Sequence, residues 1–211
     1  LDYEYLPVSR AFSKYSASAL HSQVFSSEYF AKTVPAFMNE NKITPADKGT
    51  ATHRFLQFCD FTVCKTEPEK ERDRLLRENK LSELFALNVD MESIRTFFNS
   101  SVTQRIEKAE AVYREKQFTL SKSICELDST IPKAFADEKT VIVGKIDLIF
   151  IEDGQAVILD YKTDNVKNTD ILAKRYSEQL DLYSEAVEKA LNIKVKERIL
   201  YSLTLKEYVN V

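Results

Sequence analysis

The segment from Val141 to Asp164 constrains the fold of this 211-residue chain more than any other part of the sequence. Residues 141–152 are rich in β-branched and aromatic residues, Asp153-Gly154 is a strong hairpin turn, and residues 156–163 are again mostly apolar. This pattern predicts two antiparallel strands. Because the strands are apolar in nearly continuous runs, we expect a sheet that is covered on both faces.

Three charged residues interrupt this apolar hairpin: Asp147, Asp160 and Lys162. Charged groups in a covered strand are costly unless they are paired or bound to a metal. Side chains alternate along a strand, so Asp160 and Lys162 point to one face and Tyr161 to the other. If the register brings Asp147 alongside, two carboxylates and an ammonium converge as a site for a hard cation. The alternative is a hairpin with surface charges, since Asp-x-Lys is a short pattern.

The composition is that of an ordinary globular protein, with 44% hydrophobic and 30% charged residues. The length fits one domain over residues 1–211, or one domain with a helical insertion. No apolar run reaches membrane-spanning length, and residues 1–10 do not form a signal peptide. The chain lacks an initiator methionine, and we expect it to be a fragment of a longer protein. Its net charge of −3 does not favour a generally basic nucleic-acid binder, although basic residues can still cluster locally.

The cysteine pattern argues against a metal cluster. Cys59, Cys64 and Cys125 lack the spacing of zinc or iron–sulfur ligands. Their odd number and scattered positions fit reduced thiols in a cytoplasm, and we expect buried structural residues and no iron–sulfur cluster.

Helical patterns dominate the N-terminal half. A short helix is expected within residues 15–25, and a second helix starts at Thr44 as N-cap with Pro45 in its first turn. Gly49 inside that second helix costs about 1 kcal/mol relative to alanine, which indicates a close backbone approach or a break. Residues 66–110 are charged and helical, and residues 69–79 are expected to be a solvated helix. The expected core positions of the segment are Leu84, Phe85, Ile94, Phe97, Phe98 and Ile106.

Two polar residues stand out before the hairpin. His53 lies in the second helix, where a lone histidine is more often a hydrogen-bonded structural residue than a ligand. Residues 112–120 return to strand character. Glu115 in this strand is either a surface charge on an edge or a part of the site.

A long amphipathic helix is predicted from Asn168 to Leu191, followed by a final strand over residues 194–205. Arg175, Gln179 and Tyr183 are each four residues apart and share one face of that helix. Taken alone, this pattern describes a core helix with polar residues at its rim.

Four motifs in a fixed order resemble the PD-(D/E)xK nucleases, and specifically their RecB family. They are GTATHRFLQ from Gly49, Arg114-Glu115, GKID…ILDYKTD in the hairpin, and QLDLY from Gln179. The resemblance implies an α/β restriction-endonuclease-like core, with a mixed central sheet flanked by helices in the order αβββαβ. It also implies that residues 66–110 are a helical insertion within that core.

The resemblance further implies metal-assisted hydrolysis of DNA phosphodiester bonds. Mg²⁺ is the expected metal, and Mn²⁺ is a second candidate because a histidine is included. Lys162 would act either as the base for the attacking water or as a stabiliser of charge on the phosphate. The implied metal ligands are His53, Asp147, Asp160 and the backbone carbonyl of Tyr161. The implied catalytic group is Asp147, Asp160, Lys162, Glu115, Gln179 and Tyr183, with Arg175, Gln179 and Tyr183 as DNA contacts.

Within the RecB family, the approach PAF…TPADKGTATH and the KTD after Tyr161 are most similar to AddA-type nuclease domains. This similarity implies a single DNA strand threaded to the site, a helicase region in the parent chain that alone uses ATP, and an AddB-like partner subunit. The implied setting is a bacterial cytoplasm without membrane contact. The implied function is a DNA exonuclease in double-strand-break processing and recombinational repair.

Two alternatives are left open. A catalytically inactive module of the same fold could guide DNA or bind another protein of the complex, but such a module is expected to lose Asp147, Asp160 or Lys162, and all three are present. A free-standing or phage-borne RecB-family enzyme is the second alternative. The missing initiator methionine and the AddA-like approach to His53 weigh against it.

Overall fold

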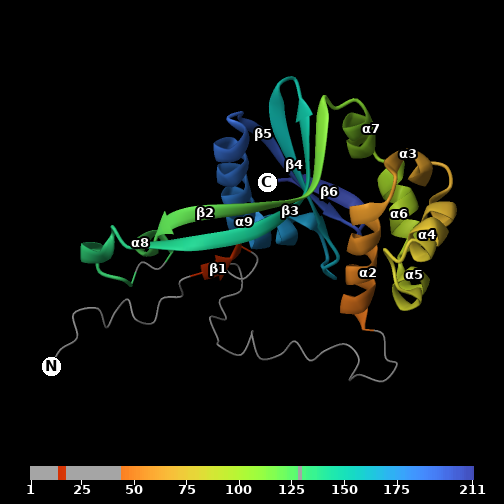
Figure 1. Cartoon of the computed structure of the whole chain (residues 1–211), viewed down its shortest axis with the longest axis horizontal. Coiled ribbons are helices and arrows are strands. Elements are labelled where there is room, and N and C mark those ends of the chain that lie inside the picture. Colours follow the sequence, from red (N-terminus) through yellow and green to blue (C-terminus); the bar gives the residue numbers. More distant parts are fainter. Residues whose placement is uncertain (1–13, 18–43, 128–129) are drawn as a thin grey trace.

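The computed structural model describes residues 14–17, 44–127 and 130–211, and its centre is a mixed six-stranded sheet flanked by helices (Figure 1). β2–β3, β3–β4 and β5–β6 are antiparallel pairs, whereas β1–β3 and β4–β5 are parallel. The α/β class expected from the sequence is confirmed. The strands are β1 (Lys14–Ser16), β2 (Ala111–Ser123), β3 (Lys139–Glu152), β4 (Gln155–Lys162), β5 (Val195–Ser202) and β6 (Glu207–Asn210).

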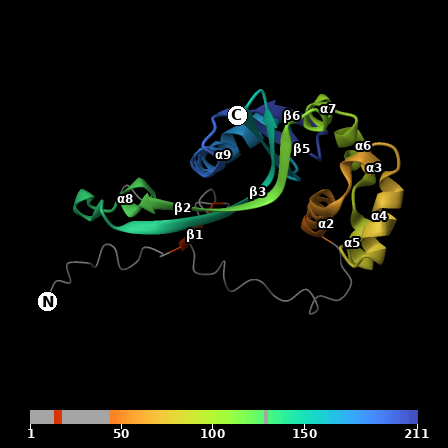
Figure 2. The ribbon, with the colours of Figure 1, turned by 45° about the horizontal axis from the view of Figure 1, so that its top comes forward.

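The predicted hairpin is formed by β3 and β4, with ends close to those expected. Its turn residues Asp153 and Gly154 both have positive φ, 54° and 69°, as a two-residue type I′ turn requires. The second half of β3 pairs with β4. Nearly the whole of β3 pairs with β2, and these two strands extend together as an arm away from the helices (Figures 1 and 2).

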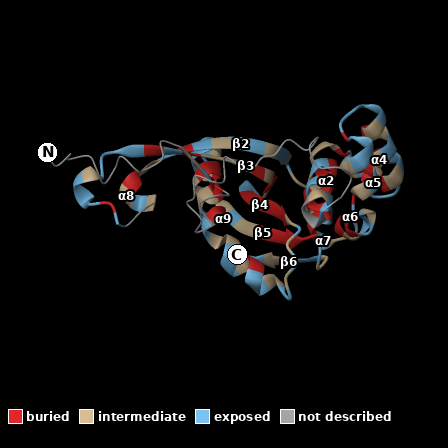
Figure 3. Ribbon diagram, turned by 90° about the horizontal axis from the view of Figure 1, so that it is seen from below, coloured by how far each residue is buried: buried red, intermediate tan, exposed pale blue. Residues whose placement is uncertain are grey.

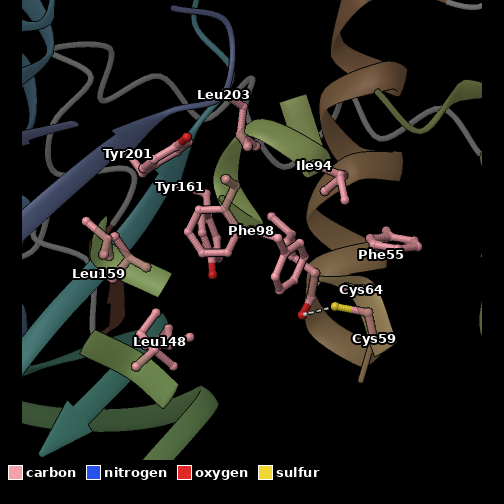
Figure 4. Packing of buried hydrophobic residues seen from close by; sticks show 14 of the residues in the cluster. Phe55, Cys59, Cys64, Ile94, Phe98, Leu148, Leu159, Tyr161, Tyr201 and Leu203 are labelled. Carbon is pink, nitrogen blue, oxygen red and sulfur yellow. Dashed lines mark hydrogen bonds between the residues drawn. The ribbon is translucent and has the colours of Figure 1, made fainter. Parts of the chain in front are cut away.

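Helices α2 to α7 cover one face of the sheet. Their buried side chains form one cluster with Leu159 and Tyr161 of β4 and Tyr201 of β5. Figure 4 shows strand residues such as Tyr161 facing helix residues such as Phe98 across this cluster. Residues 66–110 therefore share the core of the sheet, and their status as a family insertion stays a prediction. The helices are α2 (Pro45–Phe58), α3 (Phe61–Cys64), α4 (Pro68–Arg77), α5 (Glu83–Asn88), α6 (Met91–Phe98) and α7 (Ser101–Glu107).

Helix α9 (Thr169–Leu191) covers the opposite face, where its buried residues turn toward the strands (Figure 3). Asn168 caps this helix by accepting a hydrogen bond from the backbone N–H of Ile171 at 3.3 Å. Leu180 and Val187 pack in the same cluster as Ile158 of β4. Two shorter elements, α8 (Ile124–Leu127) and a 3₁₀ helix (Lys133–Phe135), lie at the far end of the β2–β3 arm. The sheet is thus covered on both faces, as the apolar strands predicted.

The expected core of residues 66–110 is confirmed except at one position. Leu84 is 51% exposed, because the short helix α5 turns Ala86 and not Leu84 into the core. Phe85 packs at the margin of the cluster. The positions that are buried as expected are Ile94, Phe97, Phe98 and Ile106.

The expectation of a purely solvated helix over residues 69–79 is wrong. Glu71 and Leu75 of α4 are buried. Glu71 accepts hydrogen bonds from the backbone N–H of Asp60 at 2.6 Å and from the Arg74 side chain at 2.8 Å. These bonds compensate for burial of the carboxylate, whose pKa is lowered although burial alone would raise it.

Other expectations met mixed outcomes. Tyr15 and Ser16, expected at the start of a helix, lie in β1, and residues 18–25 of that helix are outside the described part of the chain. Cys59 and Cys64 are buried as expected, but Cys125 is only half-buried. Strands β1 and β6 were not anticipated from the sequence pattern.

Helix α2 begins where the sequence predicted. The Thr44 hydroxyl accepts from the backbone N–H of Asp47 at 3.2 Å, and Asp47 Oδ2 accepts from that of Thr44 at 2.8 Å. The helix continues without a break through Gly49. A Cβ atom at Gly49 would lie 2.5 Å from Thr163 Oγ1, just beyond β4. Gly49 therefore allows α2 to approach the end of β4, which places His53 near the hairpin.

We predict that Gly49→Ala destabilises the fold by about 1–3 kcal/mol, because the added methyl overlaps Thr163. In an unhindered helix the same change would stabilise by about 1 kcal/mol. Thermal unfolding of Gly49→Ala, Thr163→Ala and the double variant tests this contact. The double variant should lose less stability than the sum of the single variants. Equal or higher stability of Gly49→Ala would contradict the close approach.

Candidate active site

The two hairpin carboxylates lie at the open end of the β3–β4 ladder. Leu148 opposite Leu159 is the last ladder pair, and the next residues outward are Asp147 and Asp160. Asp147 Oδ2 accepts a hydrogen bond from the backbone N–H of Tyr161 at 2.9 Å, so it caps β4 where the strands separate. The Asp160 side chain is 3% exposed, and its Oδ2 accepts no hydrogen bond within the described residues.

The carboxylates repel each other. Burial raises the pKa of Asp147 well above its ordinary value, and the charge of Asp160 raises it further. The hydrogen bond from Tyr161 and the charge of Lys162 lower this pKa without cancelling the rise. Two buried carboxylates cost folding free energy, which a bound cation would offset.

Lys162 brings a positive charge to the same place. Its Nζ lies 2.6 Å from Asp160 Oδ2, donates to Gln179 Oε1 at 3.1 Å, and sits 3.8 Å from the centroid of the Tyr176 ring. Burial lowers the pKa of Lys162, but Asp160 and Asp147 raise it and the net shift is upward. Lys162 is therefore an ammonium at neutral pH.

Helix α9 contributes Gln179 and Tyr183, which lie one turn apart on its buried face. Gln179 accepts from Lys162 through Oε1 and donates through Nε2 to the Tyr183 hydroxyl at 2.7 Å. Burial and the charge of Asp160 raise the pKa of Tyr183, so the phenol stays neutral. The Tyr183 ring packs edge-to-face on Phe118 of β2, with centroids 5.5 Å apart. A polar chain thus runs from Asp160 through Lys162 and Gln179 to Tyr183.

Helix α2 brings His53 to the other side of Asp147. His53 Nδ1 lies 3.7 Å from Asp147 Oδ2, which is too long for a hydrogen bond. Burial lowers the pKa of His53, with Asp160 opposing, so the imidazole is neutral. Its ring packs edge-to-face on Tyr161, with centroids 6.0 Å apart. Because the Tyr161 ring lies in the helical core, only the backbone of Tyr161 is open to the site.

Glu115 interrupts β2 next to the site. The β2–β3 ladder pairs Arg114 with Leu148 and Lys116 with Ile146, but skips Glu115, whose φ is 54°. A non-glycine residue in this left-handed conformation costs about 1–2 kcal/mol. Its carboxylate forms an ion pair with Lys145 and acts electrostatically on Asp147 and His53. The structure therefore groups Glu115 with the site and not with the solvent-facing edge.

Arg175 is not brought into this cluster. Its Nη1 donates to Asp164 Oδ1 at 2.6 Å, and its side chain is 43% exposed. The Tyr176 hydroxyl also donates to Asp164, at 3.0 Å. Arg175 shares a helix face with Gln179 but stays at the rim, because Asp164 holds it there.

Three residues of the site were not singled out from the sequence. Lys145 pairs with Glu115, Tyr176 lies under Lys162, and Asp164 holds Arg175. Lys145 and Asp164 occur in the GKID and KTD strings, so their motifs contained the signal. Tyr176 was counted only as an apolar position of the long helix.

The donor set fits a hard divalent cation. Asp147 and Asp160 supply carboxylate oxygens, one of them buried without a hydrogen bond, and His53 is neutral and beside them. Among the described residues, no three His, Cys, Asp or Glu side chains converge as a complete metal-binding group. Mg²⁺ is commonly held by one or two carboxylates with waters and substrate phosphates completing its shell, and this donor set suits that mode.

A sequence profile of the PD-(D/E)XK nuclease superfamily matches residues 24–208. The chain belongs to this superfamily. Its restriction-endonuclease-like sheet and the Asp-x-Lys pattern at the end of β4 agree with that membership.

The relatives of this superfamily member include the large A subunits of ATP-dependent helicase/nucleases. The chain is 35% identical over 175 residues to the one from Clostridium acetobutylicum, covering 79% of this chain and 14% of that protein. The proteins of the same name are 36% identical over 179 residues in Clostridium kluyveri and 35% over 182 residues in Bacillus pumilus, covering 83% and 79% of this chain. The chain spans 14% of the length of each of these relatives.

Among solved structures, the crystal structure of SSO0001 matches with a TM-score of 0.36 and 13% identity, covering 81% of this chain and 76% of that one. A likeness this weak carries no argument about the fold. In the described part of the chain, no helix is both long and apolar enough to cross a membrane.

We predict that Asp147→Asn stabilises the metal-free protein by about 1 kcal/mol at pH 8. The folded-state pKa of Asp147 is raised, so its favourable contribution is present below the unfolded value and is lost as pH rises. Asparagine cannot ionise, and its amide oxygen can still accept from the Tyr161 N–H.

Thermal unfolding in EDTA at pH 8 and pH 4 measures this effect, which should shrink at the lower pH. Asp73→Asn on exposed α4 is the matched control. Adding Mg²⁺ should stabilise the wild type more than Asp147→Asn. A less stable Asp147→Asn protein at pH 8 would contradict the repulsion between the carboxylates.

Proposed function

We propose that this chain is a metal-dependent DNA exonuclease domain that hydrolyses phosphodiester bonds. The observation that carries the proposal is the convergence of Asp147, Asp160 and Lys162 at the end of the hairpin, in a member of a nuclease superfamily. The catalytically inactive module remains the alternative. The presence of all three residues, with Lys162 ordered by Gln179, favours activity.

In this proposal, Asp147 and Asp160 hold Mg²⁺ or Mn²⁺, with His53 and the Tyr161 carbonyl completing the protein ligands. The bound cation would lower the pKa of a coordinated water and stabilise negative charge on the phosphate. The Lys162 ammonium hydrogen-bonds to the reacting phosphate or to the attacking water. Gln179 restrains Lys162.

The outer residues have supporting roles in the proposal. Tyr183 supports Gln179 through its hydroxyl, and Glu115 tunes the charge beside Asp147. Arg175 lies at the rim, where it would contact the phosphate backbone of the incoming strand after leaving Asp164. DNA contacts by Gln179 and Tyr183 would be limited to their site-facing atoms, because both side chains are buried.

The identity with the helicase/nuclease proteins supports a parent chain that also contains a helicase, the region that would use ATP. We propose that the parent protein works with an AddB-like partner subunit in double-strand-break processing and recombinational repair, in a bacterial cytoplasm. A single strand delivered by the helicase would be the substrate of this site.

We predict that Asp160→Asn and Lys162→Met each reduce nucleotide release from labelled linear single-stranded DNA at least about 100-fold, because each removes charge at the reacting phosphate. Lys189→Met, an exposed lysine at the far end of α9, should retain activity. The assay compares Mg²⁺, Mn²⁺ and EDTA. Equal activity of the two site variants and the wild type would reject the mechanism, and an inactive but folded wild type in every metal would favour the inactive-module alternative.

A further inference from the structure

A pocket of about 600 Å³ adjoins the site on the side of α2, α5 and α6. α2 and α5 pack against each other there, as Figure 1 shows. The proposed hydrolysis does not by itself use this pocket. The lining residues that matter for the argument are Lys48, Thr52, Leu87, Met91, Thr163 and Asn165.

The pocket is continuous with the candidate active site through the chain. Thr163 directly follows Lys162, and Gly49, which also lines the pocket, lies one helical turn before His53. Thr52 directly precedes His53 on the same helix. A ligand in this pocket would therefore lie beside the metal-binding carboxylates and not on a remote surface.

One wall of the pocket is apolar and open. Leu87 is 83% exposed, although it is an aliphatic residue on a short helix beside a buried core. Met91 is half-buried next to it, and both side chains line the same pocket. An aliphatic wall of this kind suits the flat face of a nucleobase.

The other wall is polar, with uncommitted groups. Lys48 is exposed, and its ammonium has no ion-pair or hydrogen-bond partner among the described residues. The Asn165 amide likewise has no partner within the described residues. Thr52 is already committed, since its hydroxyl donates to the Lys48 carbonyl at 2.9 Å and accepts from the Asp90 N–H at 3.2 Å. The Asp90 carboxylate, which also lines the pocket, is occupied in capping α6 through Ser93.

We propose that this pocket binds one nucleotide of a single-stranded DNA substrate, adjacent to the phosphate that is hydrolysed. The base contacts Leu87 and Met91, Asn165 hydrogen-bonds to the base or sugar, and Lys48 neutralises the neighbouring phosphate. A pocket of this volume admits a nucleotide but not a duplex. This inference rests on the proposed nuclease function and adds a substrate subsite to it.

The test measures binding of a fluorescein-labelled single-stranded oligonucleotide by anisotropy, in EDTA so that no cleavage occurs. Leu87→Ser and Lys48→Gln should each weaken binding about five- to twentyfold. Lys48→Gln should also reduce the steepness of the salt dependence by about one phosphate contact. With Mg²⁺, both variants should raise KM for single-stranded DNA more than they change kcat.

The chain offers matched controls. Leu84 lies on the same helix as Leu87 and is 51% exposed, but it does not line the pocket. Leu84→Ser should bind like the wild type, as should Lys70→Gln on α4, where Lys70 is 72% exposed. Thermal unfolding of each variant verifies that the fold is intact.

Unchanged affinity and KM in Leu87→Ser and Lys48→Gln would overturn the subsite. If the wild type still degrades DNA and Asp160→Asn does not, that result leaves the proposed function standing. A folded wild type that neither binds nor degrades single-stranded DNA would overturn both. Equal weakening by Leu84→Ser and Leu87→Ser would also overturn the subsite, because it would indicate a general apolar surface that another part of the parent protein covers.

Discussion

The alternation of side chains along β4 is the constraint on which the site and both cores depend. Leu159 and Tyr161 enter the core beneath α2 to α7, whereas Ile158 belongs to the core beneath α9. Asp160 and Lys162 have the same parity as Ile158, and Lys162 meets Gln179 of α9. A one-residue slip would exchange the two sets and bury charges among aromatic rings, so the apolar contacts fix the charged site.

The site is held together against its own electrostatics. Asp147 and Asp160 are buried close to each other, and Glu115 keeps a left-handed backbone beside them. Such unfavourable features persist only where surrounding structure over-determines them. Here the Tyr161 N–H and the Lys162 ammonium satisfy part of the charge. Sites of this kind commonly trade stability for the ability to bind a ligand.

Five elements meet at the site, and each reaches it for a different physical reason. β3 and β4 bring the carboxylates by pairing, and α9 brings Gln179 by covering the sheet. α2 brings His53 because Gly49 lets the helix contact Thr163. β2 brings Glu115 through a break in its ladder with β3. Unpaired charge and open space both occur where these elements end, which is why the pocket with Leu87 lies next to the carboxylates.

The sequence by itself determined the hairpin, its Asp153-Gly154 turn and the helix that follows, because strand alternation, turn chemistry and helical periodicity are local properties. The motif resemblance added the family and the candidate site residues. Only the tertiary structure decided that Leu84 is exposed, that Glu71 is buried, and that Asp164 draws Arg175 to the rim. Periodicity shows which face of an element is apolar, but the neighbours that cover a face or pair with a charge come from distant parts of the chain.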